Sequence, residues 1–364
     1  MNSFGNKFRI TVFGESHGPY IGVVMDGVTP GIELSEEDFS KDLERRKKGD
    51  LTLLAEGVTA RQEEDVPVFA SGILNGVTTG APLAILFENK MQNSKDYGSF
   101  RNHPRPSHAD FAASCKFNGF NDLRGGGMFS GRMTTALVAA GVVAKKMLKA
   151  AGLNITFCAK ISSIGGVPGA NSKEEASANI EGWASANTAG EAEANKWKEI
   201  IHAAKAEGDS VGGEITCKIN GVPAGKGAPF FDSLESQIAH LAFSVPGVKG
   251  VRFGDFSDIH GRTIAASSLK GSEFNDAIID KEGTTATNHS GGINGGLSNG
   301  NPIVFTLDIR PTASIAKPQR TLNLETGQME DLSIGGRHDA CIALRIPVIA
   351  EAISAIVLAN NCGG

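Results

Sequence analysis

The sequence predicts an α+β fold in which antiparallel sheets pack against buried helices. Short β-branched segments bounded by Gly, Pro or Asn occur along the whole chain, and no regular alternation with helices separates them. This pattern disfavours a doubly wound parallel sheet, in which strands and helices alternate. Two long segments are so apolar that they must lie inside the protein, covered by a sheet or by each other.

The 364-residue chain has the composition of an ordinary globular protein. Hydrophobic residues make up 40% and charged residues 21%, a balance that disfavours both disorder and a coiled coil. The formal net charge of −5 disfavours nucleic-acid partners, whose phosphates require a basic face. Because the chain shows no internal repeat and no linker-like shift in composition, we expect a single domain over residues 1–364.

The cysteines and the apolar segments indicate the cellular compartment in which the protein is located. The five cysteines are scattered and form no CxxC pattern and no cluster with histidine, so we expect reduced thiols and no metal site. The N-terminal sequence does not resemble a signal peptide, and no apolar stretch reaches 18 residues without a charged or polar break. We therefore expect a cytoplasmic protein with no membrane partner.

The individual elements follow from local sequence signals. Residues 35–49 form a predicted helix, with Ser35 as its N-cap, two glutamates in the first turn and four cations before Gly49. β-branched segments bounded by turn residues predict strands. The predicted strands are residues 8–13, 20–25, 82–88, 213–219 and 301–309.

Two apolar helices and one polar excursion complete the expected fold. The first helix runs from Ser130, its N-cap, to Gly152, and the second begins with Pro347 in its first turn. Both carry few polar side chains, which predicts that most of their surface is buried. Residues 170–208 are rich in Ala, Ser, Glu and Asn, and we expect them to form surface helices outside the core.

The stretch FGESHG, residues 13–18, matches the Gly-x-Ser-x-Gly pattern of a nucleophile elbow. An elbow needs a helix directly after the serine, whereas Pro19 and a predicted strand follow here. The stretch is therefore predicted to be a bend between two strands, with Ser16 and His17 displayed on it. Taken alone, it could be an ordinary polar turn.

Three other segments combine histidine, arginine and glycine. The segment RPSHAD is too polar to belong to the core, the segment DLRGGGMFSGR leads into the first apolar helix, and the segment GGRHDACIALR precedes the second. Their side chains of interest are Arg105, His108, Arg124, Ser130, Arg132, Arg337, His338, Asp339 and Arg345.

These segments suit the chemistry of anions. A glycine loop that leads into a helix offers free N–H groups and a positive dipole end. Histidine exchanges protons near neutral pH, and arginine binds carboxylates or phosphates through a planar fork. Each segment alone could be a solvated loop, but together they predict an enzyme for a small, multiply anionic substrate. No glycine cluster matches GxGxxG or a P-loop, so a cofactor would need a different kind of site.

Eight motifs occur in the order found in chorismate synthases, a family that the chain resembles from about residue 7 to residue 360. They are FGESHG, SKDY at 94–97, RPSHAD, RGGG, GDSVGG, GGINGGLSNG, RPTASI and GRHDAC. The resemblance implies a β-α-β sandwich and a homotetramer. It also implies the conversion of 5-enolpyruvylshikimate 3-phosphate to chorismate by a 1,4-anti elimination of phosphate, which uses reduced FMN without net redox change.

The resemblance assigns roles to individual residues of this chain. His17 would protonate or polarise the reduced flavin, His108 would assist the departing phosphate, and Asp339 would take part in removing the ring proton. The flavin-binding residues would be Ser130, Gly295, Arg310, Pro311, Thr312, Ala313, Ser314 and Arg337. The substrate-binding residues would be Ser16, Arg46, Arg105 and Arg132.

The chain also departs from the family pattern. Met128 and Phe129 stand where many members have polar residues, and the stretch GDLTLLAEGV after the first helix contains no arginine. The chain contains no recognisable reductase domain. We therefore expect an external flavin reductase to supply reduced FMN, and no NAD(P)H-dependent rate without an added reductant.

Two other interpretations are open at this point. A flavin-independent phosphatase or lyase for a sugar-like phosphate would need a metal cluster or an activated nucleophile. A non-enzymatic symmetric scaffold would use the glycine loops only as turns, which leaves the gathering of arginine and histidine unexplained. A spectral change of dithionite-reduced FMN on addition of substrate would distinguish the three.

Overall fold

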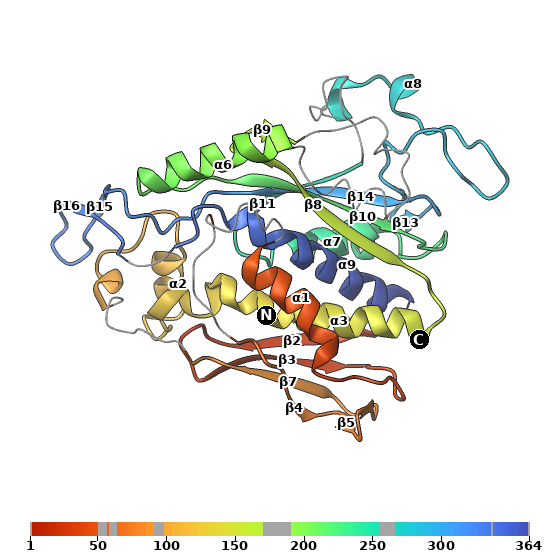
Figure 1. The fold of residues 1–364 in the computed structure, drawn as a ribbon, viewed down its shortest axis with the longest axis horizontal. Coiled ribbons are helices and arrows are strands. Elements are labelled where there is room, and N and C mark those ends of the chain that lie inside the picture. Colours follow the sequence, from red (N-terminus) through yellow and green to blue (C-terminus); the bar gives the residue numbers. More distant parts are fainter. Residues whose placement is uncertain are drawn as a thin grey trace.

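The computed structural model contains two five-stranded sheets with helices between them (Figure 1). Every strand pair among the described residues is antiparallel, which confirms the predicted α+β class with antiparallel sheets. The residues described by the structure are 2–49, 57, 64–90, 98–169, 191–254, 266–335 and 338–362.

The first sheet, at the bottom of Figure 1, has the strand order β1-β2-β3-β7-β4. Alternate residues of β3, namely Ile21, Val23 and Met25, are fully buried, as expected for a strand with one face on the core. The three strands predicted here are confirmed to within one residue. The strands are β1 (Ser3–Phe4), β2 (Arg9–Gly14), β3 (Tyr20–Asp26), β4 (Val68–Ser71) and β7 (Leu83–Glu88).

The second sheet has the strand order β11-β14-β10-β8-β9. Ile215 lies opposite Leu307 and Cys217 lies opposite Phe305, and all four side chains are fully buried. The two predicted strands in this sheet are confirmed. The strands are β8 (Thr156–Ile164), β9 (Val167–Pro168), β10 (Gly213–Asn220), β11 (Val248–Phe253) and β14 (Ile303–Ile309).

Four helices lie between the sheets: α1 (Glu37–Lys48), α3 (Thr134–Ala150), α7 (Leu234–Ala242) and α9 (Ile346–Cys362). α3 packs on the first sheet, α9 packs on the second, and the two helices pack on each other. A Cβ atom on Gly141 would lie only 2.5 Å from Cβ of Ala352, so this close helix contact requires glycine at 141. Both predicted apolar helices are thus confirmed as core helices.

Smaller elements surround this framework. The helices are α2 (Asp110–Lys116), α6 (Glu191–Ala206) and α8 (Gly271–Phe274). The strands are β5 (Ile73–Leu74), β6 (Val77–Thr78), β12 (Ile293–Asn294), β13 (Leu297–Ser298), β15 (Gln319–Leu322) and β16 (Met329–Leu332). The 3-10 turns are η2 (Gly98–Arg101), η3 (Arg124–Phe129), η4 (Gly131–Met133), η5 (Phe230–Asp232), η6 (Ala266–Ser268) and η7 (Ile342–Arg345).

One segment of the described chain, Ile342–Cys362, is long and apolar enough to cross a membrane by length and composition alone. It consists of η7 and α9, and most of it is buried between the other elements of the protein. That burial is typical of a core helix.

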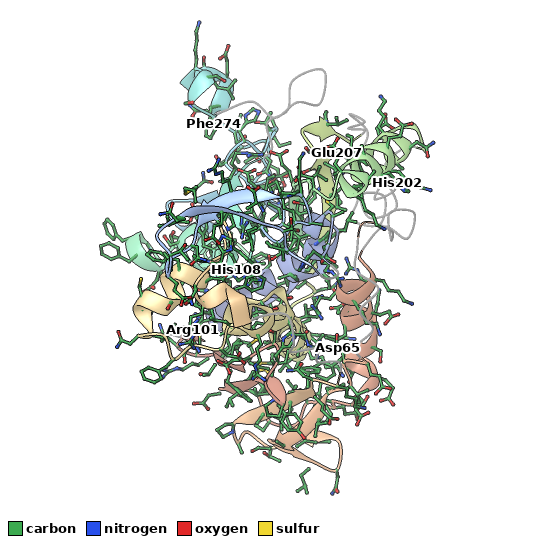
Figure 2. The ribbon with its side chains drawn as sticks, turned by 90° about the vertical axis from the view of Figure 1, so that its left-hand side faces the viewer. Asp65, Arg101, His108, His202, Glu207 and Phe274 are labelled. Carbon is green, nitrogen blue, oxygen red and sulfur yellow. The ribbon has the colours of Figure 1, made fainter. Side chains whose placement is uncertain are left out.

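One local prediction was wrong. α1 begins at Glu37, and Ser35 does not cap it; the backbone N–H of Ser35 instead donates to Oδ2 of Asp38 at 2.8 Å. α6 lies in the excursion that was expected at the surface, and His202 does lie on its outer side (Figure 2). The opposite face of α6 carries the buried Trp197, whose indole N–H donates to the carbonyl of Val167, so α6 is a surface helix that packs on the core through one face. Residues 170–190 lie outside the described residues.

Candidate active site

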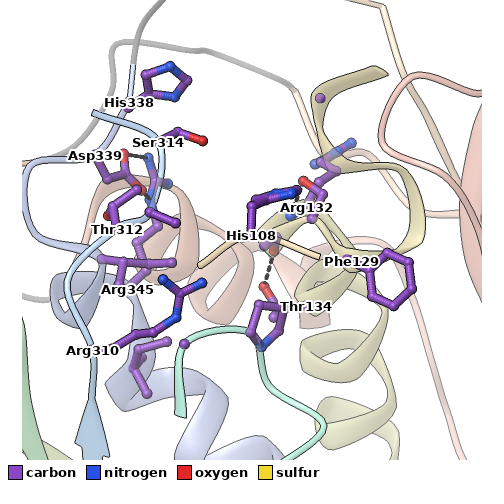
Figure 3. A pocket seen from close by; sticks show the side chains of 18 of the residues that line it. His108, Phe129, Arg132, Thr134, Arg310, Thr312, Ser314, His338, Asp339 and Arg345 are labelled. Carbon is purple, nitrogen blue, oxygen red and sulfur yellow. Dashed lines mark hydrogen bonds and ion pairs between the residues drawn. The ribbon is translucent and has the colours of Figure 1, made fainter. Parts of the chain in front are cut away.

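A cavity of about 290 Å³ lies between the glycine loop at the start of α3 and the segments that follow β14 and precede α9 (Figure 3). Cationic side chains outnumber carboxylates in the described part of its lining. Six of them, Arg46, Lys47, Arg105, Arg132, Arg310 and Arg345, face two carboxylates, Asp65 and Asp339. The cavity therefore carries an excess of positive charge inside a protein whose net charge is negative.

Most residues predicted as functional from the sequence line this one cavity. They are His17, His108, Asp339, Ser130, Arg310, Pro311, Thr312, Ala313, Ser314, Arg46, Arg105 and Arg132. Two do not line it: Ser16 is fully buried and its hydroxyl donates to the carbonyl of Arg124 at 3.2 Å, and Gly295 lies at the exposed turn between β12 and β13. Arg337, the SKDY motif and most of the GDLTLLAEGV stretch lie outside the described residues.

The bend between β2 and β3 is confirmed, and it packs against the glycine triplet of η3. Gly125 and Gly126 have φ angles of 59° and 104°, which favour glycine. A Cβ atom on Gly125 would lie 2.1 Å from Cε1 of His17, and one on Gly126 would lie 3.3 Å from Nε2 of His108. The missing side chains thus allow the two histidines to approach the same loop. His17 is only 4% exposed, so the bend is buried against this loop and is not a solvated polar turn.

Ser130 caps the helical segment that follows the glycine loop, as predicted. Its hydroxyl accepts a hydrogen bond from the backbone N–H of Arg132 at 3.2 Å. The cap belongs to the short turn η4, after which α3 begins at Thr134. This arrangement places Arg132 at the start of the helix, where its side chain faces the cavity.

The two charged ends of the RPSHAD segment, Arg105 and Asp110, are buried, although the segment is too polar for the core and Ser107 between them is exposed. Nε and Nη2 of Arg105 each donate to the carboxylate of Asp110 at 2.7 Å, and both side chains are 2% exposed. Burial acts to raise the pKa of Asp110, but the hydrogen bonds and charges of Arg105 and His108 outweigh it and hold that pKa well below its usual range. A bidentate pair of this kind lets charged side chains lie inside a protein.

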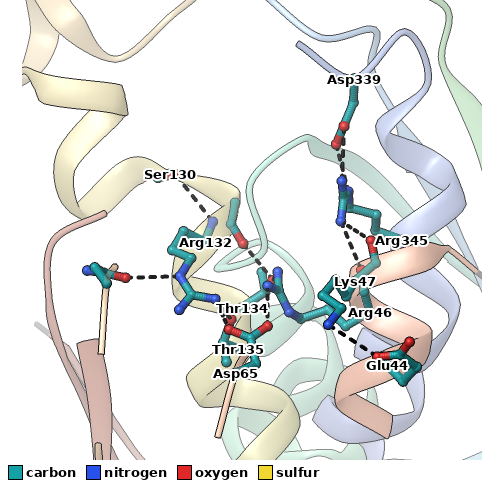
Figure 4. A network of polar contacts seen from close by, with 12 residues as sticks. Glu44, Arg46, Lys47, Asp65, Ser130, Arg132, Thr134, Thr135, Asp339 and Arg345 are labelled. Atoms are coloured by element: carbon teal, nitrogen blue, oxygen red, sulfur yellow. Dashed lines mark hydrogen bonds and ion pairs between the residues drawn. The ribbon is translucent and has the colours of Figure 1, made fainter. Parts of the chain in front are cut away.

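Asp65 joins two of the predicted substrate-binding arginines (Figure 4). Its carboxylate accepts hydrogen bonds from Nη2 of Arg46 at 3.2 Å and from Nη1 of Arg132. Burial acts to raise the pKa of Asp65, but the two guanidinium groups outweigh it and lower that pKa. Burial lowers the pKa of Arg46 to about 10, although Asp65 opposes this shift.

Both arginines retain donors that protein groups do not use. Nε of Arg46 and Nη2 of Arg132 are buried, and neither has a hydrogen-bond partner among the described residues. A buried donor without a partner costs free energy, and an anionic ligand would remove that cost. The arginine pair therefore suits a carboxylate or phosphate.

We expect Asp65→Asn to destabilise the protein by about 3 to 5 kcal/mol at neutral pH, because it leaves two buried guanidinium groups without their counter-ion. The pKa of Asp65 is lower in the folded than in the unfolded chain, so its contribution is present above the ordinary value of 3.8 and is lost as the pH falls below it. Urea unfolding between pH 7 and pH 3 measures both effects. The exposed Asp331 provides the control, because Asp331→Asn should leave the acid dependence of stability unchanged.

Asp339 is held by Arg345 on the other side of the cavity. Nε and Nη2 of Arg345 donate to the Asp339 carboxylate at 2.8 and 3.2 Å, and Nη1 donates to the carbonyl of Lys47 at 2.5 Å. Arg345 thus ties the end of α1 to the segment that carries Asp339 (Figure 4). The neighbouring His338 also lines the cavity, and burial lowers its pKa, which keeps the ring mostly neutral near pH 7.

Sequence reasoning missed two carboxylates of this site, Asp65 and Asp110. For Asp110 a signal was present, since it lies two residues after His108 in the same motif. For Asp65 no local signal exists, because its partners lie 19 and 67 residues away in the chain.

The cavity, with its excess of cations, its two histidines on a glycine loop and its carboxylate opposite them, defines an enzyme for a small anionic substrate. The chain belongs to the chorismate synthase family, whose sequence model matches residues 8–362. It is 49% identical over 360 residues to a chorismate synthase of Chitinophaga pinensis, with 99% of this chain and 96% of that protein covered.

Two further comparisons agree. A chorismate synthase of Opitutus terrae is 42% identical over 367 residues, covering 99% of this chain and 96% of that protein. A crystal structure of chorismate synthase superposes with a TM-score of 0.70 at 25% identity, covering 98% of this chain and 92% of that one. Enzymes of this family are flavin-dependent lyases that form chorismate and phosphate in the last step of the shikimate pathway, towards aromatic amino acids. The phosphatase and scaffold interpretations are therefore set aside.

Proposed function

We propose that this chain binds reduced FMN and 5-enolpyruvylshikimate 3-phosphate together in the described cavity and catalyses the 1,4-anti elimination of phosphate there. The buried donors of Arg46 and Arg132 carry the proposal, because they are cationic and lack partners among the described residues. The substrate has one phosphate and two carboxylates, which would use these donors. Family membership supports the reaction itself.

The residues between 310 and 314 would hold the flavin. Nη1 of Arg310 donates to the carbonyl of Pro311 at 3.3 Å, and burial lowers the pKa of Arg310. Oγ1 of Thr312 is buried with no hydrogen-bond partner among the described residues, so this loop has polar groups left for a ligand. Phe129, across the cavity, offers an aromatic surface that is 38% exposed. When bound, reduced FMN supplies an electron-rich ring that can lend charge to the allylic system.

The titratable side chains around the cavity would manage protons. His108 would hold a proton near the departing phosphate, and His17, buried on the same glycine loop, would hold one near the flavin. Asp339, kept in place by Arg345, would act with the flavin in removing the ring proton of the substrate. Positioned proton transfer of this kind is typically worth two to four orders of magnitude in rate.

We further propose that the chain is a single β-α-β sandwich domain that assembles as a homotetramer. The helices between the two sheets support the sandwich (Figure 1). The neighbouring Phe230 and Phe231, which are both largely exposed, support association, since adjacent exposed apolar side chains often mark a contact surface. An external flavin reductase would supply the reduced cofactor. The cytoplasmic location, and the absence of membrane and nucleic-acid partners, stay predictions.

An anaerobic turnover assay tests the proposed reaction. One reduced flavin per active site should support many turnovers, oxidised FMN should support none, and chorismate and phosphate should appear in equal amounts. Substrate should also change the absorption spectrum of the reduced flavin. Oxidation of one flavin for each product formed would instead make the enzyme an oxidoreductase and would contradict the assigned roles of His17 and Asp339.

A further inference from the structure

We infer that Asp110 is a positioning residue, which holds His108 as the tautomer with its proton on Nδ1 and leaves Nε2 to face the ligands in the cavity. The inference deepens the proposed function, because it states in which form His108 meets the substrate. It concerns the free protein, so it can fail without affecting the proposed reaction.

The first step is the contact between the two side chains. Nδ1 of His108 lies 2.7 Å from Oδ1 of Asp110, the distance of a strong hydrogen bond. Because the pKa of Asp110 is held low, its carboxylate is ionised and can only accept hydrogen bonds. The proton of this hydrogen bond must therefore belong to Nδ1.

Arg105 raises a competing possibility that the geometry removes. Its Nη2 lies 3.1 Å from Nδ1 of His108, a distance at which Nδ1 could instead accept a hydrogen bond. However, the same Nη2 lies closer to Oδ1 of Asp110, at 2.7 Å, and that oxygen is charged. The N–H of Arg105 Nη2 therefore donates to the charged carboxylate of Asp110 and not to the ring, so Nδ1 of His108 remains a donor.

The second step concerns the opposite ring nitrogen. Nε2 of His108 makes no hydrogen bond with any described residue, and it faces Gly126, whose missing side chain leaves the space beside it open. With the neutral ring protonated at Nδ1, Nε2 carries the lone pair. This nitrogen can then take up a proton and pass it to a leaving oxygen in the cavity.

The third step is the rigidity of the carboxylate. The backbone N–H of Arg105 donates to Oδ2 of Asp110 at 3.1 Å, in addition to the two side-chain hydrogen bonds of Arg105. Nη1 of Arg105 donates to the hydroxyl of Ser314 at 3.3 Å, and its guanidinium stacks 4.5 Å above the ring centre of Phe100. Asp110 is therefore fixed on both sides, and it orients His108 relative to the loop proposed to bind FMN.

Asp110→Asn should invert the tautomer. Two donors of Arg105, its backbone N–H and Nε, point at Oδ2, so the new amide should place its oxygen there. The amide nitrogen then faces Nδ1 of His108, and Nδ1 must accept a hydrogen bond from it. The proton of the neutral ring moves to Nε2, which loses its lone pair, and turnover should fall by about 100-fold or more with little change in KM.

Nitrogen-15 spectra of histidine-labelled enzyme without flavin or substrate test the inference directly. The ring signals of His108 are identified by their absence from His108→Gln. At a pH where the ring is neutral, the wild type should show the proton on Nδ1 and Asp110→Asn should show it on Nε2.

Glu351 provides a matched control, because its carboxylate is 5% exposed and accepts from Nη1 and Nη2 of Arg45 at 2.8 and 3.0 Å, outside the cavity lining. Glu351→Gln should lose stability as Asp110→Asn does, yet keep the Nδ1 tautomer of His108. A wild-type spectrum with the proton on Nε2 would overturn the inference, whether or not Asp110→Asn folds. So would the same tautomer in the wild type and in folded Asp110→Asn.

Discussion

His108→Ala is expected to lower turnover by about two to four orders of magnitude while the protein stays folded. The loss reflects the removal of a positioned proton donor at the departing phosphate. The fold should survive because Asp110 keeps its bidentate contact with Arg105 when the imidazole is absent. Anaerobic turnover with reduced flavin measures the first effect, and circular dichroism with thermal unfolding measures the second.

His202 offers a control for the loss of an imidazole. It is exposed on α6, on the outer side of the protein (Figure 2), so His202→Ala should keep normal turnover. His17→Ala should behave like His108→Ala. Near-normal turnover in either cavity variant would remove that histidine from the mechanism.

Gly125→Ala should reduce turnover by about 100-fold or more, because the new methyl group would occupy the space of the His17 ring. The Cβ position lies 2.1 Å from Cε1 of His17 and 3.0 Å from Oγ of Ser16, so His17 must move away from the cavity. Misplacing a catalytic group by about 1 Å can cost 100-fold in rate. Turnover and the histidine NMR signals of His17 should change together.

The strain of alanine in a left-handed conformation must be separated from this displacement. Gly327 has a φ of 68°, close to the 59° of Gly125, and no atom lies within 4 Å of its Cβ position. Gly327→Ala should therefore carry the same backbone cost, about 1 kcal/mol, without loss of turnover. If both variants lost activity equally, strain and not the position of His17 would be the cause.

Much of the framework could be predicted from local sequence patterns. The helices α3 and α9 are recognisable because nearly all of their side chains are apolar, and such a segment has no stable place outside a core. The start of α1 was misplaced by two residues, because Asp38 accepts a hydrogen bond from the backbone N–H of Ser35 while no side chain caps the helix.

The polar interior of the site was harder to predict. The RPSHAD segment has the composition of an exposed loop, and the ion pair between Arg105 and Asp110 is what allows these two charged side chains to be buried. Local patterns could not identify Asp65, because its role depends on two arginines brought together by α1 and η4. The composition of a segment indicates whether the segment is exposed to solvent. The ion pairs that its charged side chains form inside the protein depend on the complete tertiary structure.

The position of α9 in the chain affects how the protein can be made. This helix contacts α3, α7, β8 and β10, yet all the strands of both sheets precede it in the sequence. During translation, both sheets therefore emerge from the ribosome before the helix that fills the space between them. The nascent chain must carry uncovered β-branched surface at this stage, a condition that favours aggregation. We expect chaperone dependence during synthesis to be greatest just before residues 346–362 emerge, and ribosome-nascent chains arrested before and after this segment would reveal it.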